Sequence, residues 1–529
     1  MLTYQELALA LLAVGAVYLY TFARKASRAP LPPGPRRLPV IGNLLDLPAR
    51  MVWETYMAWA KEYDSAVLHA DVFGQPLIVL NTYEACTDLL DKRSASYSGR
   101  PAIPMVTELM GWNDNLALMP CAELECRRRG RRLLHEHIGS KPAAVERIRP
   151  LLARCVGTFL HRMLDARPGA LQGELHYLMG TIILGAAYGI TPKPEHDAYV
   201  ATADAVSTSV TRASAPGAYL VNVLPFLKYV PAWFPGARFQ RDAQEWRKAV
   251  RALVERPFEE VKCRMADGTA MPSMVCSALS EANSAEEEKD IQATAAVLYS
   301  AGMDTTMFTM HFFFRTLLDH PEVQSRAAAE MDAVLLPGKL PGLDDVSCLP
   351  YTTAVVHETF RFRPIAPQQG FPRMYTGERP DEYNGYTIPT GSMIVQNIWC
   401  SKYPDPDDFK PERFLTADGA LDPDVRNPCK TVFGFGRRVC PGKDLAYATL
   451  WLVAASTLRI YSIRKAKGKD GKDIEPSSDI ISSGVVMCIG LLTGLEFATH
   501  TRCRKPAPYK CSFELRNEEA RAIIDGLTG

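Results

Sequence analysis

The stretch FGFGRRVCPG, residues 433–442, restricts the possible folds of this chain more severely than any other segment. Gly434 and Gly436 permit backbone conformations and close approaches that a side chain would prevent. Pro441 suits the first position of a helix, where a backbone N–H is not needed. We therefore expect a tight loop that ends with Cys440 at the N-terminus of a helix, where the helix dipole favours a thiolate.

Three simpler readings of Cys440 are a buried free cysteine, half of a disulfide, and a zinc ligand. The chain has 13 cysteines, an odd number without a disulfide-framework spacing, which indicates a reducing compartment. No C-x-x-C pair lies near Cys440 to complete a zinc site. Arg438, two residues before the sulfur, can bind a carboxylate. A thiolate, room for a flat group and a carboxylate-binding arginine together indicate thiolate-ligated haem.

The N-terminal segment carries the strongest compositional signal. Residues 7–23 read LALALLAVGAVYLYTFA, an uncharged run about long enough to span a bilayer. Arg24, Lys25 and Arg28 follow it, so the positive-inside rule places the body of the protein in the cytosol. A cleaved signal peptide is the alternative, but its basic residues would precede the apolar run. We expect a membrane anchor over residues 1–25.

The rest of the chain divides into a proline-rich hinge over residues 26–43 and one large domain over residues 44–529. A hydrophobic content of 47% can build a large core, and a net charge of +1 gives no reason to expect nucleic-acid binding. Residues 66–71 and 77–81 have the pattern of strands, and so do residues 386–389 and 392–396. Residues 145–164 and 243–265 have helical periodicity. The expected fold is mainly α with a minor β region.

A further helix is expected from Ser284, where Ser284 and Glu287 form a capping-box pattern, to a stop at Pro321. It is apolar on all sides, which predicts a buried central helix. The stretch AGMDTT, residues 301–306, interrupts it. Small residues there can reflect simple helix packing, or a local bulge in the helix. A buried acid such as Asp304 beside the Thr305 hydroxyl can pass protons from solvent to a buried centre.

Two charged tetrapeptides follow, ETFR at residues 358–361 and PERF at residues 411–414. Each alone is commonplace, because such charge pairs are often solvated. In the fixed order AGMDTT, ETFR, PERF and FGFGRRVCPG, however, the four motifs resemble the cytochrome P450 family of haem-thiolate monooxygenases. The resemblance extends over nearly the whole chain, and its style is similar to microsomal members from basidiomycete fungi.

The resemblance implies a cytochrome P450 fold, with a single large haem domain behind an N-terminal transmembrane helix. It implies haem b as cofactor, with the iron held by the Cys440 thiolate. Phe433 would shield the sulfur, and Asp304 and Thr305 would be the catalytic acid–alcohol pair. The other implied cofactor-binding residues are Arg438, Gly434, Arg131, Arg373, Ala301 and Gly302, and the implied structural network is Glu358, Arg361 and Arg413.

The implied activity is insertion of one oxygen atom from O2 into an apolar small molecule by hydroxylation, in fungal secondary metabolism such as terpenoid biosynthesis. The chain shows no P-loop and no dinucleotide fingerprint, so electrons must come from a partner, an NADPH–cytochrome reductase. The implied location is the endoplasmic reticulum membrane, single-pass, with the catalytic domain facing the cytosol. Two alternatives are a haem-thiolate isomerase or peroxygenase, and a catalytically impaired haem-binding membrane protein.

The chain departs from the family pattern in three places. Arg127 stands where the family usually has a propionate-binding tryptophan, four residues before Arg131. The link from Trp399 to Tyr403 is short, and residues 487–501 form an apolar insert in a loop that usually caps the substrate pocket. Each departure adjoins ordinary family sequence, so we hypothesise that at least one reflects an imperfect gene model, which sequencing of the transcript would test.

Overall fold

The computed structural model describes residues 29–47, 51–119, 124–214, 218–368, 370–398, 403–482 and 504–527. The expected anchor over residues 1–25, the link at residues 399–402 and the insert at residues 487–501 lie outside these ranges. Within these ranges, no helix combines the length and the apolar composition that crossing a membrane requires.

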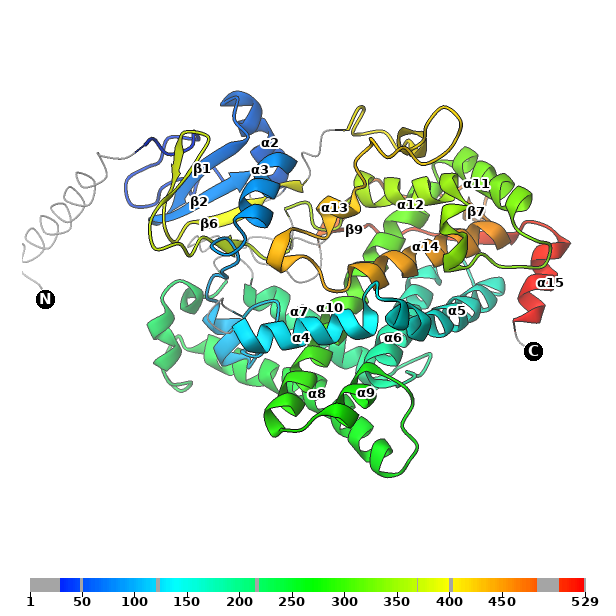
Figure 1. Ribbon diagram of the computed structural model, residues 1–529, viewed down its shortest axis with the longest axis horizontal. Coiled ribbons are helices and arrows are strands. Elements are labelled where there is room, and N and C mark those ends of the chain that lie inside the picture. The colour runs from blue at the N-terminus through cyan, green and yellow to red at the C-terminus, as the bar shows by residue number, and fades with distance from the viewer. Residues whose placement is uncertain are drawn as a thin grey trace, which may run out of the picture.

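Helices make up most of the molecule, and they surround one central helix (Figure 1). This helix is α10, Ala285–Leu317, and it packs against helices from most of the body. The others are α4 (Leu124–Ile138), α5 (Pro142–Leu164), α6 (Leu171–Tyr188), α7 (Ala198–Ser214), α8 (Arg238–Ala266), α9 (Met274–Glu281), α11 (Pro321–Val334), α12 (Pro350–Phe362) and α14 (Lys443–Ile460). The expected mainly helical fold is therefore present.

The ends of α10 follow from its sequence. Ser284 caps the helix by accepting a hydrogen bond from the Glu287 N–H at 3.2 Å. The Glu287 carboxylate accepts from the N–H of Asn283 at 2.8 Å, one residue before the position that a capping box would use. The helix ends at Leu317, and Pro321 begins α11.

The local bulge considered for α10 at residues 301–306 is not formed, because the α-helix runs unbroken through them. The Thr305 hydroxyl donates to the Ala301 carbonyl at 3.0 Å, one turn earlier. A threonine that bonds back to the preceding turn in this way is accommodated without interrupting the helix. Gly302 lies against α6, where an added Cβ would meet Ile183 Cδ1 at 2.6 Å.

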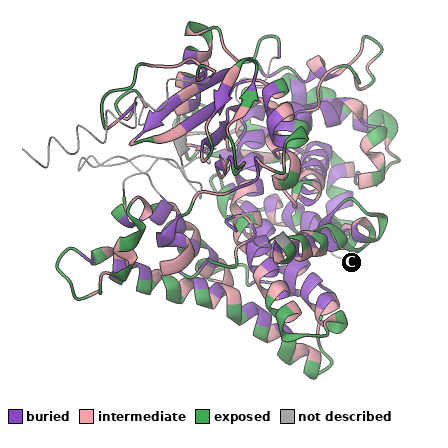
Figure 2. Ribbon diagram, turned by 60° about the vertical axis from the view of Figure 1, so that its left-hand side comes forward, coloured by how far each residue is buried: buried purple, intermediate pink, exposed green. Residues whose placement is uncertain are grey.

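A small sheet lies to one side of the helices, in the order β1–β2–β6–β3 (Figure 1). It consists of β1 (Val67–Val72), β2 (Gln75–Leu80), β6 (Met393–Gln396) and β3 (Arg373–Met374). β1 and β2 form an antiparallel hairpin, β6 pairs in parallel with β2, and β3 pairs antiparallel with β6. Much of this sheet is buried (Figure 2). The strands expected near residues 66–71, 77–81 and 392–396 are therefore confirmed.

The proline-rich segment lies against this region of the protein. The Thr387 N–H donates to the Pro30 carbonyl at 2.8 Å, and the His69 N–H donates to the Pro33 carbonyl at 2.9 Å. Proline has no backbone N–H to donate, so these prolines bind the neighbouring segments through their carbonyl oxygens. Residues 29–43 are thus held to the body at least at two points.

The remaining strands form three two-stranded pairs. They are β4 (Asp381–Tyr383) with β5 (Tyr386–Ile388), β7 (Tyr461–Lys465) with β10 (Cys511–Leu515), and β8 (Ile480–Ser482) with β9 (Arg504–Pro506). β9 returns the chain to the side of α10. The small helices α2 (Val52–Glu62), α3 (Tyr83–Cys86), α13 (Cys429–Val432) and α15 (Glu518–Gly526) complete the fold, together with short turns.

Candidate functional site

A cavity of about 390 Å³ lies between α10, α4 and the loop that precedes α14. The segment AGMDTT lines it from α10, and the FGFGRRVCPG loop lines it through Phe433, Arg438 and Cys440. Arg131 and Arg373 also line it, from α4 and β3. The fold thus brings together residues that are more than 300 positions apart in the chain.

The loop before α14 depends on its glycines. Gly434 has a φ of +84°, in the left-handed region that favours glycine. A Cβ at Gly436 would lie 2.1 Å from the Leu90 carbonyl oxygen, so no side chain fits there. The Cys440 N–H donates to the Phe433 carbonyl at 2.7 Å and closes the loop.

Cys440 does not sit directly at the start of the helix. α14 begins at Lys443 with Gly442 as its N-cap, so the expectation that Pro441 occupies the first helical position is wrong by two residues. Burial raises the pKa of the Cys440 thiol, while the Gly442 N–H and the Arg131 charge act in the opposite direction. A thiolate at this position therefore needs a positive partner, which a metal ion would supply.

The cavity wall has an excess of positive charge. Among the described residues that line it, Asp304 is the single carboxylate, against Arg100, Arg127, Arg131, Arg363, Arg373 and Arg438. Arg127, at the position of the family tryptophan, is only 4% exposed. Buried cations are costly unless anions pair with them. The arrangement therefore fits a flat ligand that carries carboxylates.

Arg373 gives the most direct evidence for such a ligand. Its side chain is 1% exposed, and burial lowers its pKa to about 10. Its Nη2 donates to the Phe435 carbonyl at 2.7 Å, but Nε and Nη1 find no partner in the described parts of the chain. Unpaired buried donors of a charged group are expensive to maintain. A carboxylate in the cavity would satisfy them.

Arg438 lines the cavity and also binds backbone carbonyls. Its guanidinium donates to the carbonyls of Ser98, Leu116 and Met119 at 2.9, 3.2 and 2.6 Å. Three of the five N–H groups of arginine are used in this way. Arg438 therefore joins the cysteine loop to residues 98–119.

Asp304 and Thr305 both line the cavity from α10. The Ser207 hydroxyl, on α7, donates to Asp304 Oδ2 at 2.6 Å. Burial raises the pKa of the Asp304 carboxyl, although the hydrogen bond from Ser207 opposes this shift. A carboxyl whose pKa is raised can hold a proton at higher pH than an exposed one, which suits a proton donor.

Glu358, Arg361 and Arg413 meet beside α12. Arg361 Nε and Nη2 donate to the two Glu358 oxygens at 2.6 and 2.8 Å, and Arg413 Nε donates to Glu358 Oε1 at 3.1 Å. Both arginines also bond carbonyls of the segment at residues 404–408. This network joins α12 to the segment that leads to the cysteine loop.

Comparison with known proteins identifies the family. The family model for cytochrome P450 matches residues 32–487 of the chain. The chain belongs to the cytochrome P450 family. This P450 therefore uses haem b, with iron and a cysteine thiolate as axial ligand, and it is a monooxygenase. Haem is a flat group with two carboxylates, which can pair with the arginines of the cavity wall.

Several curated relatives match this P450 over nearly its full length. Cytochrome P450 monooxygenase 98 of Postia placenta is 37% identical over 97% of this chain and 96% of that protein. Cytochrome P450 monooxygenase ple1 of Rhodocybe pseudopiperita is 36% identical over 97% of this chain and 94% of its own. Tryptamine 4-monooxygenase of Psilocybe cyanescens is 33% identical over 98% and 99%, respectively.

Sequence reasoning placed pocket-lining loops at residues 104–112 and 206–223, but it gave no individual role to several residues of this site. Trp112 lines the cavity, and its buried indole N–H has no partner among the described residues. Ser207 bonds Asp304 from a helix 97 positions away. His176 and Asp204 lie close to the same carboxyl. Nothing in the local sequence around these residues distinguishes them from ordinary polar positions on a helix.

Proposed function

We propose that this P450 hydroxylates an apolar small molecule of fungal secondary metabolism, with electrons from a separate NADPH–cytochrome reductase. The observation that carries the proposal is one cavity that has Cys440 on one wall and the Asp304–Thr305 pair on another. One wall would hold a haem, and the other would face its oxygen-binding side.

In this proposal the Cys440 sulfur would hold the haem iron. Arg373 would bind a propionate through Nε and Nη1, and Arg131, with Arg127 beside it, would be a second source of positive charge. Gly434 allows the tight loop before Cys440, and the Phe433 ring packs edge-on against Phe360 with centroids 5.3 Å apart. Haem with a thiolate ligand supplies activation of O2.

The proposed role of Asp304 and Thr305 is to deliver protons. Burial raises the pKa of Asp304, so its carboxyl can hold a proton at higher pH than an exposed one, and Ser207 orients it. The Thr305 hydroxyl donates to Ala301, which fixes its oxygen as an acceptor toward the cavity. Ala301 and Gly302 also line the cavity here, and their small size leaves space beside the Thr305 hydroxyl.

The proposed substrate is apolar, and we favour a terpenoid. The cavity wall away from the arginines is built largely of aliphatic and aromatic side chains, among them Val106, Ile183, Val210, Val297, Phe308 and Ile365. Such a wall holds its ligand by burying apolar surface. The relatives that match this chain include fungal monooxygenases, and one of them is named for an indole amine, tryptamine.

We also propose association with the endoplasmic reticulum membrane, with the catalytic domain in the cytosol. Between α7 and α8 lies an exposed apolar cluster, here called the 220–234 patch: Leu220, Leu224, Phe226, Tyr229, Trp233 and Phe234. Tyr229 and Trp233 are each 79% exposed. Exposed apolar patches of this kind indicate contact with a partner or a membrane, and aromatic side chains favour the membrane interface.

Two alternatives make different predictions. A haem-thiolate isomerase or peroxygenase has no need of a proton-donating pair, and the presence of Asp304 beside Thr305 favours the monooxygenase. A catalytically impaired haem protein would result if Arg127 prevented haem retention. The positive, carboxylate-accepting wall supports retention instead.

The experiment begins with the full chain in membranes and the carbon-monoxide difference spectrum of its reduced form. A band at the red-shifted position of thiolate-ligated haem is expected. The same membranes then receive NADPH, a cytochrome reductase and ¹⁸O₂, with α-humulene, dodecanoic acid or tryptamine as probes. A product with one ¹⁸O atom is expected from the terpenoid. A band at the neutral-ligand position would exclude Cys440 thiolate as the ligand, and an unlabelled product would exclude the monooxygenase reaction for that probe.

A further inference from the structure

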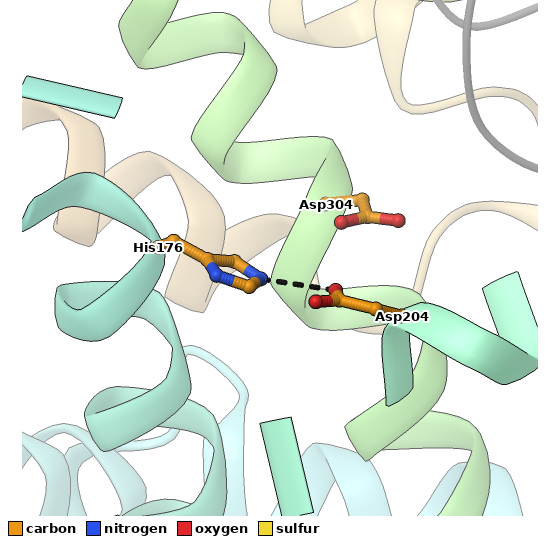
Figure 3. A group of neighbouring side chains, drawn as sticks. All are labelled: His176, Asp204 and Asp304. Atoms are coloured by element: carbon orange, nitrogen blue, oxygen red, sulfur yellow. Dashed lines mark hydrogen bonds and ion pairs between the residues drawn. The ribbon is translucent and has the colours of Figure 1, made fainter. Parts of the chain in front are cut away.

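Three titratable side chains from three different helices lie close together (Figure 3). They are His176 on α6, Asp204 on α7 and Asp304 on α10, and one ligand atom of each lies within 4.8 Å of the others. His176 Nε2 and Asp204 Oδ1 are 3.1 Å apart, and the Asp304 carboxyl lies above this pair on its own helix. The mechanism described so far uses only Asp304.

This cluster connects two environments. Asp304 lines the cavity, so its carboxyl is accessible from the haem side. The Asp204 side chain is 51% exposed and the His176 side chain is 26% exposed, so solvent reaches them. Protons for a buried reaction must cross the protein through groups that can both accept and release them. Here such groups are in near contact from the surface to the cavity.

We propose that His176 and Asp204 form the outer end of a proton inlet that resupplies Asp304. The inference rests on the proposed role of Asp304 as proton donor. In each cycle the His176 imidazolium gives one proton to the ionised Asp304 carboxylate and becomes neutral imidazole. Solvent hydronium then returns one proton to the imidazole and becomes water. The net change is one proton moved from solvent to Asp304, with no change in electron count.

The charges around the cluster suit this direction of transfer. The hydrogen bond to Asp204 raises the pKa of His176, which keeps the imidazole charged to higher pH. Burial raises the pKa of Asp304, and the Asp204 charge adds to this shift. His176 and Lys505 lower the pKa of Asp304 in opposition. Both pKa values are thus raised: the shift of Asp304 favours its acceptance of a proton, and the shift of His176 keeps the imidazole protonated, and so able to donate, at higher pH.

The test uses the full-length holoenzyme and infrared difference spectra recorded against pH. The carboxyl band that disappears in Asp304→Asn reports the protonation of Asp304. Asp204→Asn removes a negative neighbour, so the midpoint of this band is expected to move to lower pH. His176→Gln removes a positive neighbour, so the midpoint is expected to move to higher pH. These opposite shifts follow from an electrostatic link and not from general loosening of the helices.

The second readout is the NADPH-driven consumption of O2 by the holoenzyme with reductase, a rate that needs no assigned substrate. Asp204→Asn and His176→Gln are each expected to slow it by roughly tenfold and to increase its solvent deuterium isotope effect. The matched control is Glu322→Gln, since Glu322 Oε1 pairs with His320 Nδ1 at 3.0 Å on the surface of α11. This control is expected to change neither the rate nor the isotope effect.

The outcomes separate the inference from the proposed function. If Asp304→Asn slows the reaction while Asp204→Asn and His176→Gln do not, the inlet is wrong and the role of Asp304 stands. If Asp304→Asn keeps the full rate, the proposed role of Asp304 fails as well. If a chelator shifts the Asp304 midpoint of the unmodified protein, the cluster holds a cation, and the inlet is overturned.

Discussion

Arg361 donates two hydrogen bonds to the Glu358 carboxylate, of 2.6 and 2.8 Å. The Glu358 side chain is completely buried, and that of Arg361 is 5% exposed. Arg413 adds a third bond to the same carboxylate, from a side chain that is 7% exposed. The backbone N–H of Lys410 adds a fourth, at 2.7 Å. One carboxylate thus holds α12 and the segment at residues 404–413 together.

Glu358→Gln is expected to destabilise the protein strongly, because it leaves two buried arginines without their anion. Loss of one partner of a buried ion pair costs about 3–5 kcal/mol. The free energy of unfolding in denaturant and the yield of haem-loaded protein both measure this loss. The control is Glu412→Gln, since Glu412 is half exposed and its pair with Arg326 is solvated. That change should cost less than about 1 kcal/mol. Equal effects of the two substitutions would contradict the network.

Cys440→Ser is expected to abolish the thiolate-type carbon-monoxide band without unfolding the chain. Serine is nearly isosteric with cysteine, and the hydrogen bond from the Cys440 backbone N–H that closes the loop does not depend on the side chain. The matched control is Cys429→Ser, because Cys429 begins α13, before the cysteine loop, and burial raises its pKa to about 12. The control should keep the band. A band that survives Cys440→Ser, or is lost only in Cys429→Ser, would show that the ligand is misassigned.

Arg373→Met is expected to have opposite effects on the apoprotein and the holoprotein. Without haem, the change removes two unpaired buried donors, so the midpoint of thermal unfolding should rise. With haem, it removes a propionate partner, so haem should transfer to apomyoglobin about tenfold faster. Arg379→Met, at a position outside the cavity lining, is the control. Faster haem loss in the control, or no change in Arg373→Met, would count against the propionate site.

The sequence predicted the parts of the fold that depend on local rules. The Ser284 cap, the stop at Pro321 and the β1–β2 hairpin follow from residues within a few positions of one another. The prediction that Pro441 begins the helix is wrong, because the φ angle of proline fits a turn before a helix as well as the helix itself. A local pattern does not decide between these two settings.

The site was predictable only where its residues lie in one motif. Cys440, Asp304 and Glu358 lie in motifs that resemble those of the cytochrome P450 family. Of these three residues, Cys440 and Asp304 line the cavity. Ser207 and His176 were not predictable, because their roles depend on which faces of α6, α7 and α10 meet. Helical periodicity shows which face of a helix is apolar, but not which polar residues on separate helices become neighbours.

The 220–234 patch predicts direct contact between Trp233 and lipid. Trp233 fluorescence in the full chain, reconstituted in vesicles, should be quenched by brominated acyl chains, because interfacial tryptophan lies near the headgroup level. Trp233→Phe should remove that part of the quenching and keep membrane binding. Trp451, which is completely buried, provides the control, since Trp451→Phe should leave the quenching unchanged if the fold holds. Equal quenching before and after Trp233→Phe would exclude this patch from the interface.

Asp304 gives the stability of this protein a defined dependence on pH. Burial raises the pKa of its carboxyl, so the folded protein binds that proton more tightly than the unfolded chain does. Stability from this group is therefore present at low pH and is lost as pH rises from the unfolded pKa through the folded pKa. Asn cannot ionise, but it can still accept a hydrogen bond from Ser207. Asp304→Asn should match the unmodified protein in its free energy of unfolding at acidic pH and exceed it at neutral pH.

The midpoint of thermal unfolding of the apoprotein, recorded from pH 4 to pH 8, measures this difference. Asp267→Asn is the control, because Asp267 is exposed at the end of α8, and it should follow the unmodified protein at every pH. If the unfolding midpoint of Asp304→Asn falls relative to that of the unmodified protein as pH rises, the prediction has the wrong sign. Asp304 would then be stabilised as a carboxylate. If the unfolding midpoint of Asp304→Asn instead rises above that of the unmodified protein with increasing pH, the buried carboxyl destabilises the fold. If the holoenzyme with this substitution also consumes O2 more slowly, the protein keeps this destabilising acid because the reaction needs it.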